Sequence, residues 1–241
     1  MGCAYEAKMF TILMSSAFAA DDSSMTTATG AAIRWLEMPI EYVIAPDNDA
    51  ELDEDGAIYS IVSSGSAWNA VEGADVDLHF SGSVDHATFE FDETNAVLFR
   101  SDWGLDPDML AMTSVWSTPE GEALAFDLEI NTRDHGWSLK GEDGMADLQN
   151  TVTHEFGHAL GLGHLVDAPD ATMYPSAPKG ETTKRDLETV DINATLRAYS
   201  NGGIASEEVA GDAGSCNVGG VAPSWLALLI ASCFRRKELP C

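Results

Sequence analysis

Residues 154–164 read HEFGHALGLGH, and this stretch decides which fold and chemistry the sequence predicts. Residues four apart in an α-helix lie one above the other, so a helix here would present the imidazoles of His154 and His158 to a single point. Glu155 would project beside them, close enough to reach a water at that point without being a ligand itself. This half of the motif predicts a metal-binding helix.

The second half of the motif supplies a third ligand. Gly161 can adopt the left-handed conformation that ends a helix and turns the chain sharply, and the turn would bring His164 to the same point. Three protein ligands leave a fourth position for water, which is typical of a catalytic rather than a structural zinc. A bare HExxH often arises by chance. The full motif fixes five positions, namely the three histidines, Glu155 and Gly161, and all five would arise by chance in only roughly one in ten thousand chains of this length.

A methionine follows the third histidine at a distance that would let a tight turn lie under the metal. Residues 171–175 read ATMYP and place Met173 nine residues after His164. A lone methionine usually packs in a core, so its position relative to the histidines is what matters. We expect a tight turn here, with Met173 as the apolar floor beneath the metal.

These residues together resemble the metzincin metallopeptidases, whose signature is the long histidine motif followed by a methionine turn. Within that clan the chain is most similar to the matrixin type. The LQNTVT segment at residues 148–153 leads into the first histidine, and residues 173–175 (MYP) match the matrixin turn. The matrixin closing helix is similar at Leu187, Asp191, Ile192 and Tyr199. The resemblance covers roughly residues 33–200.

The resemblance implies a mixed α+β fold of the zincin type. Its parts would be a twisted, mostly parallel five-stranded sheet, an active-site helix, and a smaller C-terminal subdomain that ends in a helix. It also implies a catalytic Zn²⁺ bound by His154, His158 and His164, with Glu155 as the catalytic base and Met173 as support under the metal.

Three positions bear on the subfamily. Leu165 stands directly after the third histidine, where matrixins usually have serine or threonine, and Val190 stands where they commonly have the first of two aspartates. Tyr174 directly follows the methionine, whereas the metal-binding tyrosine of astacin-like enzymes lies two residues after it. Tyr174 is therefore not expected to be a ligand.

The rest of the domain is predicted from its patterns. Apolar and alternating runs predict strands, and an acidic segment at residues 47–56 precedes a predicted helix at 57–71. His79 and His86 are expected to be surface or partly buried residues rather than ligands. The strands are predicted at residues 39–44, 76–80, 96–99, 111–116 and 123–131. Several loop acids are expected to be solvated, although the family resemblance suggests that they could hold Ca²⁺; they are Asp102, Asp106, Asp108, Asp134 and Asp143.

Composition limits the partners. The chain has 241 residues and a net charge of −28, with 45% hydrophobic residues, which is enough for one catalytic domain with a real core at residues 21–200. A surface with this much negative charge repels nucleic acid and anionic membranes. It could favour cationic substrates or calcium, although solubility of an exported protein explains it more simply. A monomer is expected.

Both ends of the chain resemble processing segments. Residues 1–20 contain an apolar run and the small-residue pattern of a secretory signal peptide. Residues 201–215 have the composition of a flexible linker. Residues 216–241 combine Cys216, an apolar run and three basic residues, and resemble the C-terminal sorting signals of myxobacteria; a simple tail anchor is the alternative. All four cysteines lie in these ends, so no disulfide framework is expected in the catalytic domain.

The sequence thus predicts a secreted or surface-anchored zinc metalloendopeptidase. A protein or peptide substrate would pair as an extended strand along residues 111–116, and residues 174–183 would line the pocket beyond the cut bond. Two alternatives are a non-catalytic surface or adhesion protein stabilised by zinc, and a zinc amidase that acts on cell-wall peptides. Glu155 argues against the first, because a structural zinc needs no base.

Overall fold

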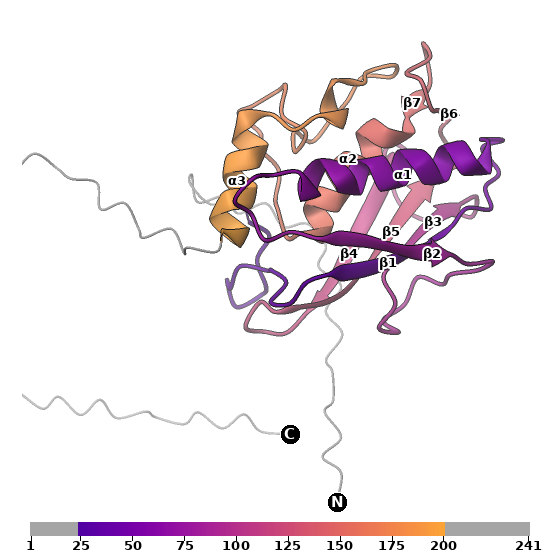
Figure 1. The fold of residues 1–241 in the computed structure, drawn as a ribbon. Helices are drawn as coiled ribbons and strands as arrows, with labels where there is room; N and C mark the ends of the chain where they lie inside the picture. The colour runs from indigo at the N-terminus through magenta and orange to yellow at the C-terminus, as the bar shows by residue number, and fades with distance from the viewer. Residues whose placement is uncertain (1–23, 201–241) are drawn as a thin grey trace, which may run out of the picture. The chain divides into compact units, whose positions relative to one another are not determined.

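A five-stranded sheet forms the centre of the protein (Figure 1), whose computed structural model describes residues 24–200. The spatial order is β2-β1-β3-β5-β4. Four strands are parallel, and β4 runs antiparallel to β5 at one edge. The strands are β1 (Ile40–Ala45), β2 (Leu78–Ser83), β3 (Ala96–Arg100), β4 (Ala111–Ser117) and β5 (Ala123–Asn131). The predicted α+β class and mostly parallel five-stranded sheet are confirmed.

Two long helices, α1 (Glu54–Asn69) and α2 (Leu148–Ala159), lie against the same face of the sheet (Figure 1). Between β5 and α2 the chain forms a small two-stranded sheet from β6 (Trp137–Ser138) and β7 (Ala146–Asp147). After α2 it continues through an irregular segment that contains the 3-10 helix η1 (Thr183–Arg185), and it ends with α3 (Thr189–Tyr199). The predicted closing helix is therefore present.

Helix α1 starts earlier than the apolar pattern indicates. The prediction placed its first residue at Ala57, whereas the helix begins at Glu54 because Asp53 caps it. The Asp53 carboxylate accepts a hydrogen bond of 2.9 Å from the backbone N–H of Gly56 and so satisfies a free donor of the first turn. The acids before this helix thus stabilise its positive end, as expected.

The core lies between the sheet and the two helices. Phe126 of β5 meets Phe156 of α2 edge to face at 6.2 Å between ring centroids, and Tyr42 of β1 packs on Phe156 at 5.1 Å. From α1, Ile61 and Trp68 are fully buried. These large side chains hold α2 close to the sheet, and α2 carries the first two histidines of the motif.

Some of the expected segments fall outside the described range. The signal peptide at 1–20, the linker at 201–215 and the sorting tail at 216–241 all lie there. Within residues 24–200, no helix has the length and apolar content needed to cross a membrane.

Candidate metal centre

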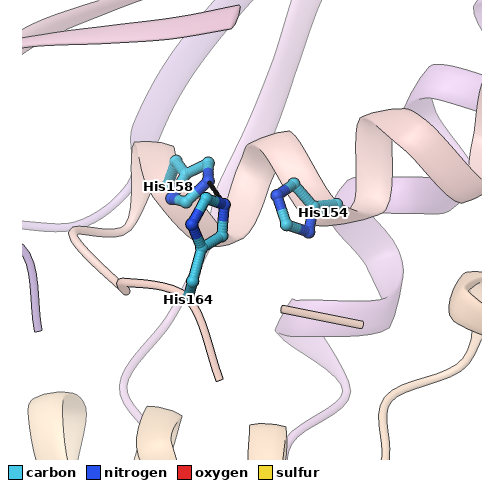
Figure 2. Close-up of side chains that lie close together, drawn as sticks. All are labelled: His154, His158 and His164. Atoms are coloured by element: carbon cyan, nitrogen blue, oxygen red, sulfur yellow. Dashed lines mark hydrogen bonds between the residues drawn. The ribbon is translucent and has the colours of Figure 1, made fainter. Parts of the chain in front are cut away.

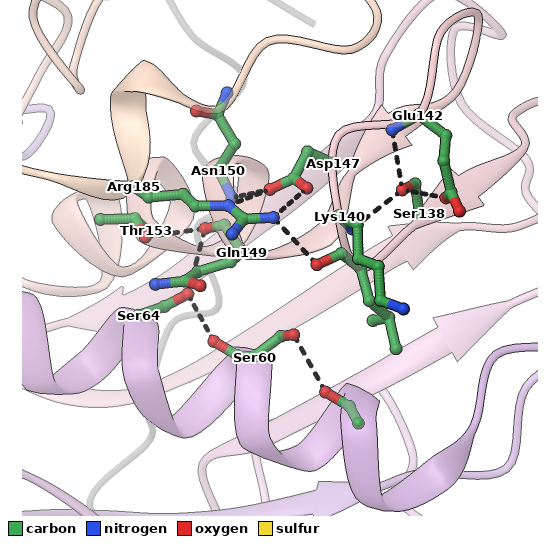
Figure 3. Close-up of polar contacts among 12 residues, drawn as sticks. Ser60, Ser64, Ser138, Lys140, Glu142, Asp147, Gln149, Asn150, Thr153 and Arg185 are labelled. Carbon is green, nitrogen blue, oxygen red and sulfur yellow. Dashed lines mark hydrogen bonds and ion pairs between the residues drawn. The ribbon is translucent and has the colours of Figure 1, made fainter.

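The start of helix α2 is fixed by an ion pair between the buried carboxylate of Asp147 and the partly exposed Arg185. Asp147 is 3% exposed, and its carboxylate accepts a hydrogen bond of 2.9 Å from the backbone N–H of Asn150 as the N-cap of the helix. Arg185 donates to both oxygens of this carboxylate, at 2.8 and 2.5 Å, and also to the carbonyl of Leu139 (Figure 3). This fork ties η1 to the beginning of α2.

Helix α2 and the turn after it bring the three histidines together. The rings of His154 and His158 lie on one side of the helix, with centroids 4.7 Å apart, and His164 approaches them from the following segment (Figure 2). The Nε2 atoms of His158 and His164 are 3.2 Å apart. One nitrogen from each histidine lies within 4.8 Å of the others.

The turn between the second and third histidines requires glycine. Gly161 has a φ of +80°, the left-handed conformation that the sequence predicted. A Cβ at this position would also lie 2.1 Å from the carbonyl oxygen of Ile33, in the N-terminal segment that packs behind the turn. Any larger residue would therefore force the turn, and with it His164, away from the other histidines.

Two of the rings are oriented by backbone carbonyls. The Nδ1–H of His154 donates to the oxygen of Thr172 at 2.7 Å, and the Nδ1–H of His158 donates to the oxygen of Leu162 at 2.8 Å. Each bond fixes the tautomer and leaves the Nε2 lone pair for a metal. Burial lowers the pKa of His154, and it lowers that of His158 to about 4. For His164, burial and then the neighbouring His158 lower the pKa to about 4.

This donor set fits zinc. The lowered pKa values keep all three imidazoles neutral near pH 7, which is the form that binds a metal. Two nitrogens at tetrahedral zinc are about 3.3 Å apart for bonds of about 2.0–2.1 Å, close to the 3.2 Å between His158 and His164. Three imidazoles together with carbonyl partners are the pattern of a catalytic zinc site.

Glu155 lies beside the histidines in a buried position. Its side chain is held from β4, where the hydroxyl of Thr113 lies 2.8 Å from Glu155 Oε2 and 3.1 Å from the Glu155 carbonyl. Burial raises the pKa of Glu155 to about 7, although hydrogen bonds from Thr113 act in the opposite direction. A carboxyl with this pKa can exchange a proton near neutral pH.

Met173 forms the floor of the centre. It is fully buried against Gly157 of α2, where an added Cβ would lie 2.2 Å from the Met173 sulfur. Asp191 of α3 anchors the turn, because its buried carboxylate accepts hydrogen bonds from the N–H groups of Thr172 at 2.8 Å and of Met173 at 3.0 Å. The carbonyl of Thr172 in turn accepts from His154, so α3 and the first histidine are linked through one short turn.

A cavity of about 350 Å³ opens at the three histidines and Glu155. The lining includes residues of β4 and of the segment before it, and also Tyr174, Pro175, Ser176, Ala177 and Lys184. The segment at 174–183 was expected to line a pocket, and its first four residues do line this one. Asn150 and Thr151 of α2 complete the lining.

The structure thus brings together His154, His158, His164, Glu155 and Met173, while His79 and His86 are exposed and lie outside this group. Among residues 24–200, no other cluster of three or more metal-binding side chains was found. Of the acids suggested for calcium, Asp102 pairs with Arg100 and Asp134 with Arg133, and calcium binding stays a prediction.

The sequence did not indicate the roles of Thr113 and Asp191 in the site. Thr113 is a polar residue on the inward-facing side of β4, between the buried Ala111 and Val115. Asp191 occupies the third helical position after Glu188, where an acidic side chain typically forms a capping box, as it does here. The alternation along β4 and the capping-box spacing at Asp191 were the signals available in the sequence. Neither shows which distant part of the chain Thr113 or Asp191 contacts.

Known proteins resemble the part of the chain that forms this centre. A sequence model described as Matrixin, of the M10 peptidases, matches residues 62–200. The chain is 45% identical over 99 residues to Metalloendoproteinase 1-MMP of Arabidopsis thaliana, covering 33% of this chain and 27% of that protein. It is 26% identical over 172 residues to human Matrilysin, covering 60% of this chain and 63% of that protein. The matches span less than two thirds of the length of either relative.

Proposed function

The chain belongs to the matrixin family, and we propose that it is a zinc-dependent endopeptidase in which Glu155 is the general base. The observation that carries the proposal is the placement of Glu155 beside three neutral histidines whose ring nitrogens converge. A site that only stabilised the fold would not need a carboxyl with a pKa raised to about 7 at the wall of a cavity.

His154, His158 and His164 would hold the zinc, which supplies Lewis acidity that acidifies water and polarises a peptide carbonyl. Glu155 would accept a proton from the attacking water and pass it to the nitrogen of the departing amine, so that one water is consumed for each peptide bond cut. Thr113 would hold the carboxylate in position during both transfers, through the hydrogen bond of 2.8 Å.

The substrate would bind as an extended peptide along β4. This strand is at the edge of the sheet, and the order of strands places no partner on its outer side within residues 24–200. An edge strand offers unpaired N–H and C=O groups to which a peptide can add as a further strand. Thr113 places the middle of β4 directly at Glu155, so a peptide bound there would pass the reacting groups.

The proposal is tested by digestion of a peptide library with the full chain. We expect cleavage that stops on removal of metal by a chelator and returns when Zn²⁺ is added back. The His164→Ala variant should cut no peptide, because one of the three ligands is lost. Zinc binding by the wild type without cleavage of any peptide would contradict an endopeptidase and would favour a non-catalytic role.

We also propose that the protein is exported and is then either released or anchored at the cell surface. The support is the signal-peptide pattern of residues 1–20 and the cysteine, apolar and basic residues of 216–241. Mass spectrometry of the protein from intact cells tests both ends. The proposal predicts a new N-terminus near residue 20 and a C-terminus near Cys216, whereas an intact terminus at Cys241 would exclude cleavage of the tail.

A further inference from the structure

The turn that carries the third histidine begins where helix α2 ends, and helix ends leave backbone groups without partners. The last carbonyls of a helix have no N–H of a following helical turn to accept from. A buried carbonyl without a donor costs free energy, so each of these oxygens needs a partner from elsewhere. The donors to the carbonyls of residues 156–162 are therefore the groups that hold the turn in place.

Four of these seven carbonyls find donors inside the turn itself. Backbone N–H groups donate to three of them, and the ring of His158 donates to the fourth; the acceptors are the oxygens of Phe156, Gly157, His158 and Leu162. In the described part of the chain, no group of the turn donates to the oxygens of Ala159, Leu160 and Gly161. These three carbonyls depend on other segments.

The first segment of the described chain supplies two of the missing donors. We call residues 24–35 the N-terminal strap. The indole Nε1–H of Trp35 donates to the oxygen of Ala159 at 2.8 Å, and the backbone N–H of Met25 donates to the oxygen of Gly161 at 2.7 Å. The strap therefore binds the end of α2 and the start of the turn from behind.

The end of helix α3 supplies the third donor. The hydroxyl of Tyr199 donates to the oxygen of Leu160 at 2.7 Å and accepts the backbone N–H of Trp35 at 3.2 Å. Tyr199 is 7% exposed, and burial raises its pKa, so the hydroxyl stays protonated and remains a donor. This one hydroxyl joins the strap, the turn and α3, the last helix of the described chain (Figure 1).

The N-terminal strap has an anchor that does not involve the histidines. Arg34 makes two backbone hydrogen bonds of 2.9 Å with the loop between β4 and β5. The Trp35 ring meets Phe126 of β5 edge to face, with centroids 6.4 Å apart. The strap thereby fixes the turn relative to the sheet, whose strand β4 holds Glu155.

His164 depends on this turn more than the other two histidines do. The Nδ1 atoms of His154 and His158 each have a carbonyl partner, whereas the Nδ1 of His164 makes no hydrogen bond within residues 24–200. The His164 ring is therefore placed by the backbone that carries it, three residues after Gly161. A shift of the turn would move this ligand first.

We propose that Trp35 and Tyr199 are positioning residues of the metal centre, which act through the turn to hold His164 where it can bind zinc. The inference rests on the zinc site of the proposed function and not on peptide cleavage. Neither residue lines the cavity at the histidines. Removal of either donor leaves a carbonyl of the turn unpaired, so the turn should shift and the affinity for zinc should fall.

The test is a titration of the metal-free full chain with Zn²⁺. Tyr199→Phe and Trp35→Phe each remove one donor and keep an aromatic ring. We expect each variant to bind zinc roughly tenfold more weakly, at the lower end of the loss seen when a partner that orients a metal ligand is removed. Tyr59→Phe removes a hydroxyl from a ring on α1 that is 73% exposed, and this control should keep the wild-type affinity.

A second control separates positioning from a general loss of stability. Ile61→Val makes a small cavity in the core beside α1, at a cost in unfolding free energy similar to that of one hydrogen bond. This variant should bind zinc as the wild type does. Co²⁺ bound in place of Zn²⁺ reports the coordination geometry through its visible spectrum, which should change in Tyr199→Phe and Trp35→Phe but not in Ile61→Val.

Wild-type zinc affinity and an unchanged Co²⁺ spectrum in both aromatic variants would overturn the proposal, as would an equal loss of affinity in Ile61→Val. Because the two aromatic variants remove different donors, the failure of one to fold leaves the other to decide. If the wild type binds zinc but cuts no peptide, the endopeptidase proposal fails, and the ratio of zinc affinities still decides the roles of Trp35 and Tyr199.

Discussion

At the scale of single residues, the metal centre depends on positions where space is limiting. Gly157 lies between the first and second histidines of the motif and faces Met173 and Trp68 rather than the metal. A Cβ there would lie 2.2 Å from the Met173 sulfur and 2.8 Å from the Trp68 ring. The glycine in the middle of the motif is thus explained by packing between α2, α1 and the methionine turn.

Gly157→Ala should therefore destabilise the protein, although alanine favours a helix over glycine by roughly 1 kcal/mol. We expect a loss of about 1–3 kcal/mol in the free energy of unfolding, as for other overpacked cores, measured by denaturant unfolding. Gly104→Ala is the control, because a Cβ there meets no atom within 4 Å. Equal stability of the two variants would show that Met173 moves aside without cost.

Thr113→Val tests how Glu155 is held. Hydrogen bonds from Thr113 favour the charged carboxylate and so lower its pKa, and removal of the hydroxyl should raise the pKa further above its ordinary value. The acid limb of the profile of kcat/KM against pH should then move to higher pH by roughly 0.5–1 unit. Activity would fall more at pH 6 than at pH 8, and an unmoved limb would contradict this role for Thr113.

At the scale of elements, the centre is assembled from parts that are far apart in the sequence. Helix α2 and its turn supply the ligands, β4 holds Glu155, and α3 anchors the methionine turn through Asp191. The Asp191 carboxylate is fully buried and accepts three backbone hydrogen bonds, from Thr172, Met173 and Glu188. Helix α3 thereby sets the position of the carbonyl that orients His154.

Asp191→Asn should weaken both the fold and the metal site. One amide oxygen cannot replace two carboxylate oxygens, so at least one buried N–H loses its acceptor, at a cost of about 1–3 kcal/mol in unfolding free energy. Zinc affinity should also fall, because the carbonyl that orients His154 is displaced. Unfolding curves and zinc titration measure the two effects. Asp186→Asn, at an exposed carboxylate close by, is the control and should change neither.

The local features of the site were predictable because they depend on residues near one another in sequence. A spacing of four on a helix placed His154 and His158 together, and the positive φ required at Gly161 indicated the turn to His164. The patterns of alternation also indicated the five strands. Their spatial order, with β4 antiparallel at the edge, does not follow from those patterns, because pairing between strands depends on contacts across the whole sheet.

The long-range contacts of the site were not predictable in the same way. Thr113 binds a residue 42 positions later, and Asp191 binds the backbone 18 and 19 positions earlier. Nothing in the local sequence of Asn150 or Lys184 places both in one cavity, because their meeting depends on how η1 packs against α2. The roles of the ligands, the base and the methionine stay predictions that the geometry supports.

At the scale of the whole molecule, metal binding and folding should be coupled. Two of the three histidines lie on α2, and the third follows a turn that packs against the N-terminal segment. Because these contacts exist only in the folded protein, the unfolded chain has no preformed metal site. Zinc at 1,000 times its Kd should then add about 4 kcal/mol to the stability of the folded state. Thermal unfolding with zinc and with a chelator measures this difference. His164→Ala should abolish most of it, whereas zinc stabilisation equal to that of the wild type would place the metal elsewhere.

The most direct test of the central claim compares the wild type with Glu155→Gln at equal zinc content. The substitution keeps the size of the side chain and removes its ability to accept a proton. We predict that both proteins bind one zinc each, and that kcat/KM for peptide cleavage falls roughly 100-fold or more, the usual contribution of a general base. Cleavage by the variant at the wild-type rate would contradict the assignment of Glu155 and the mechanism built on it.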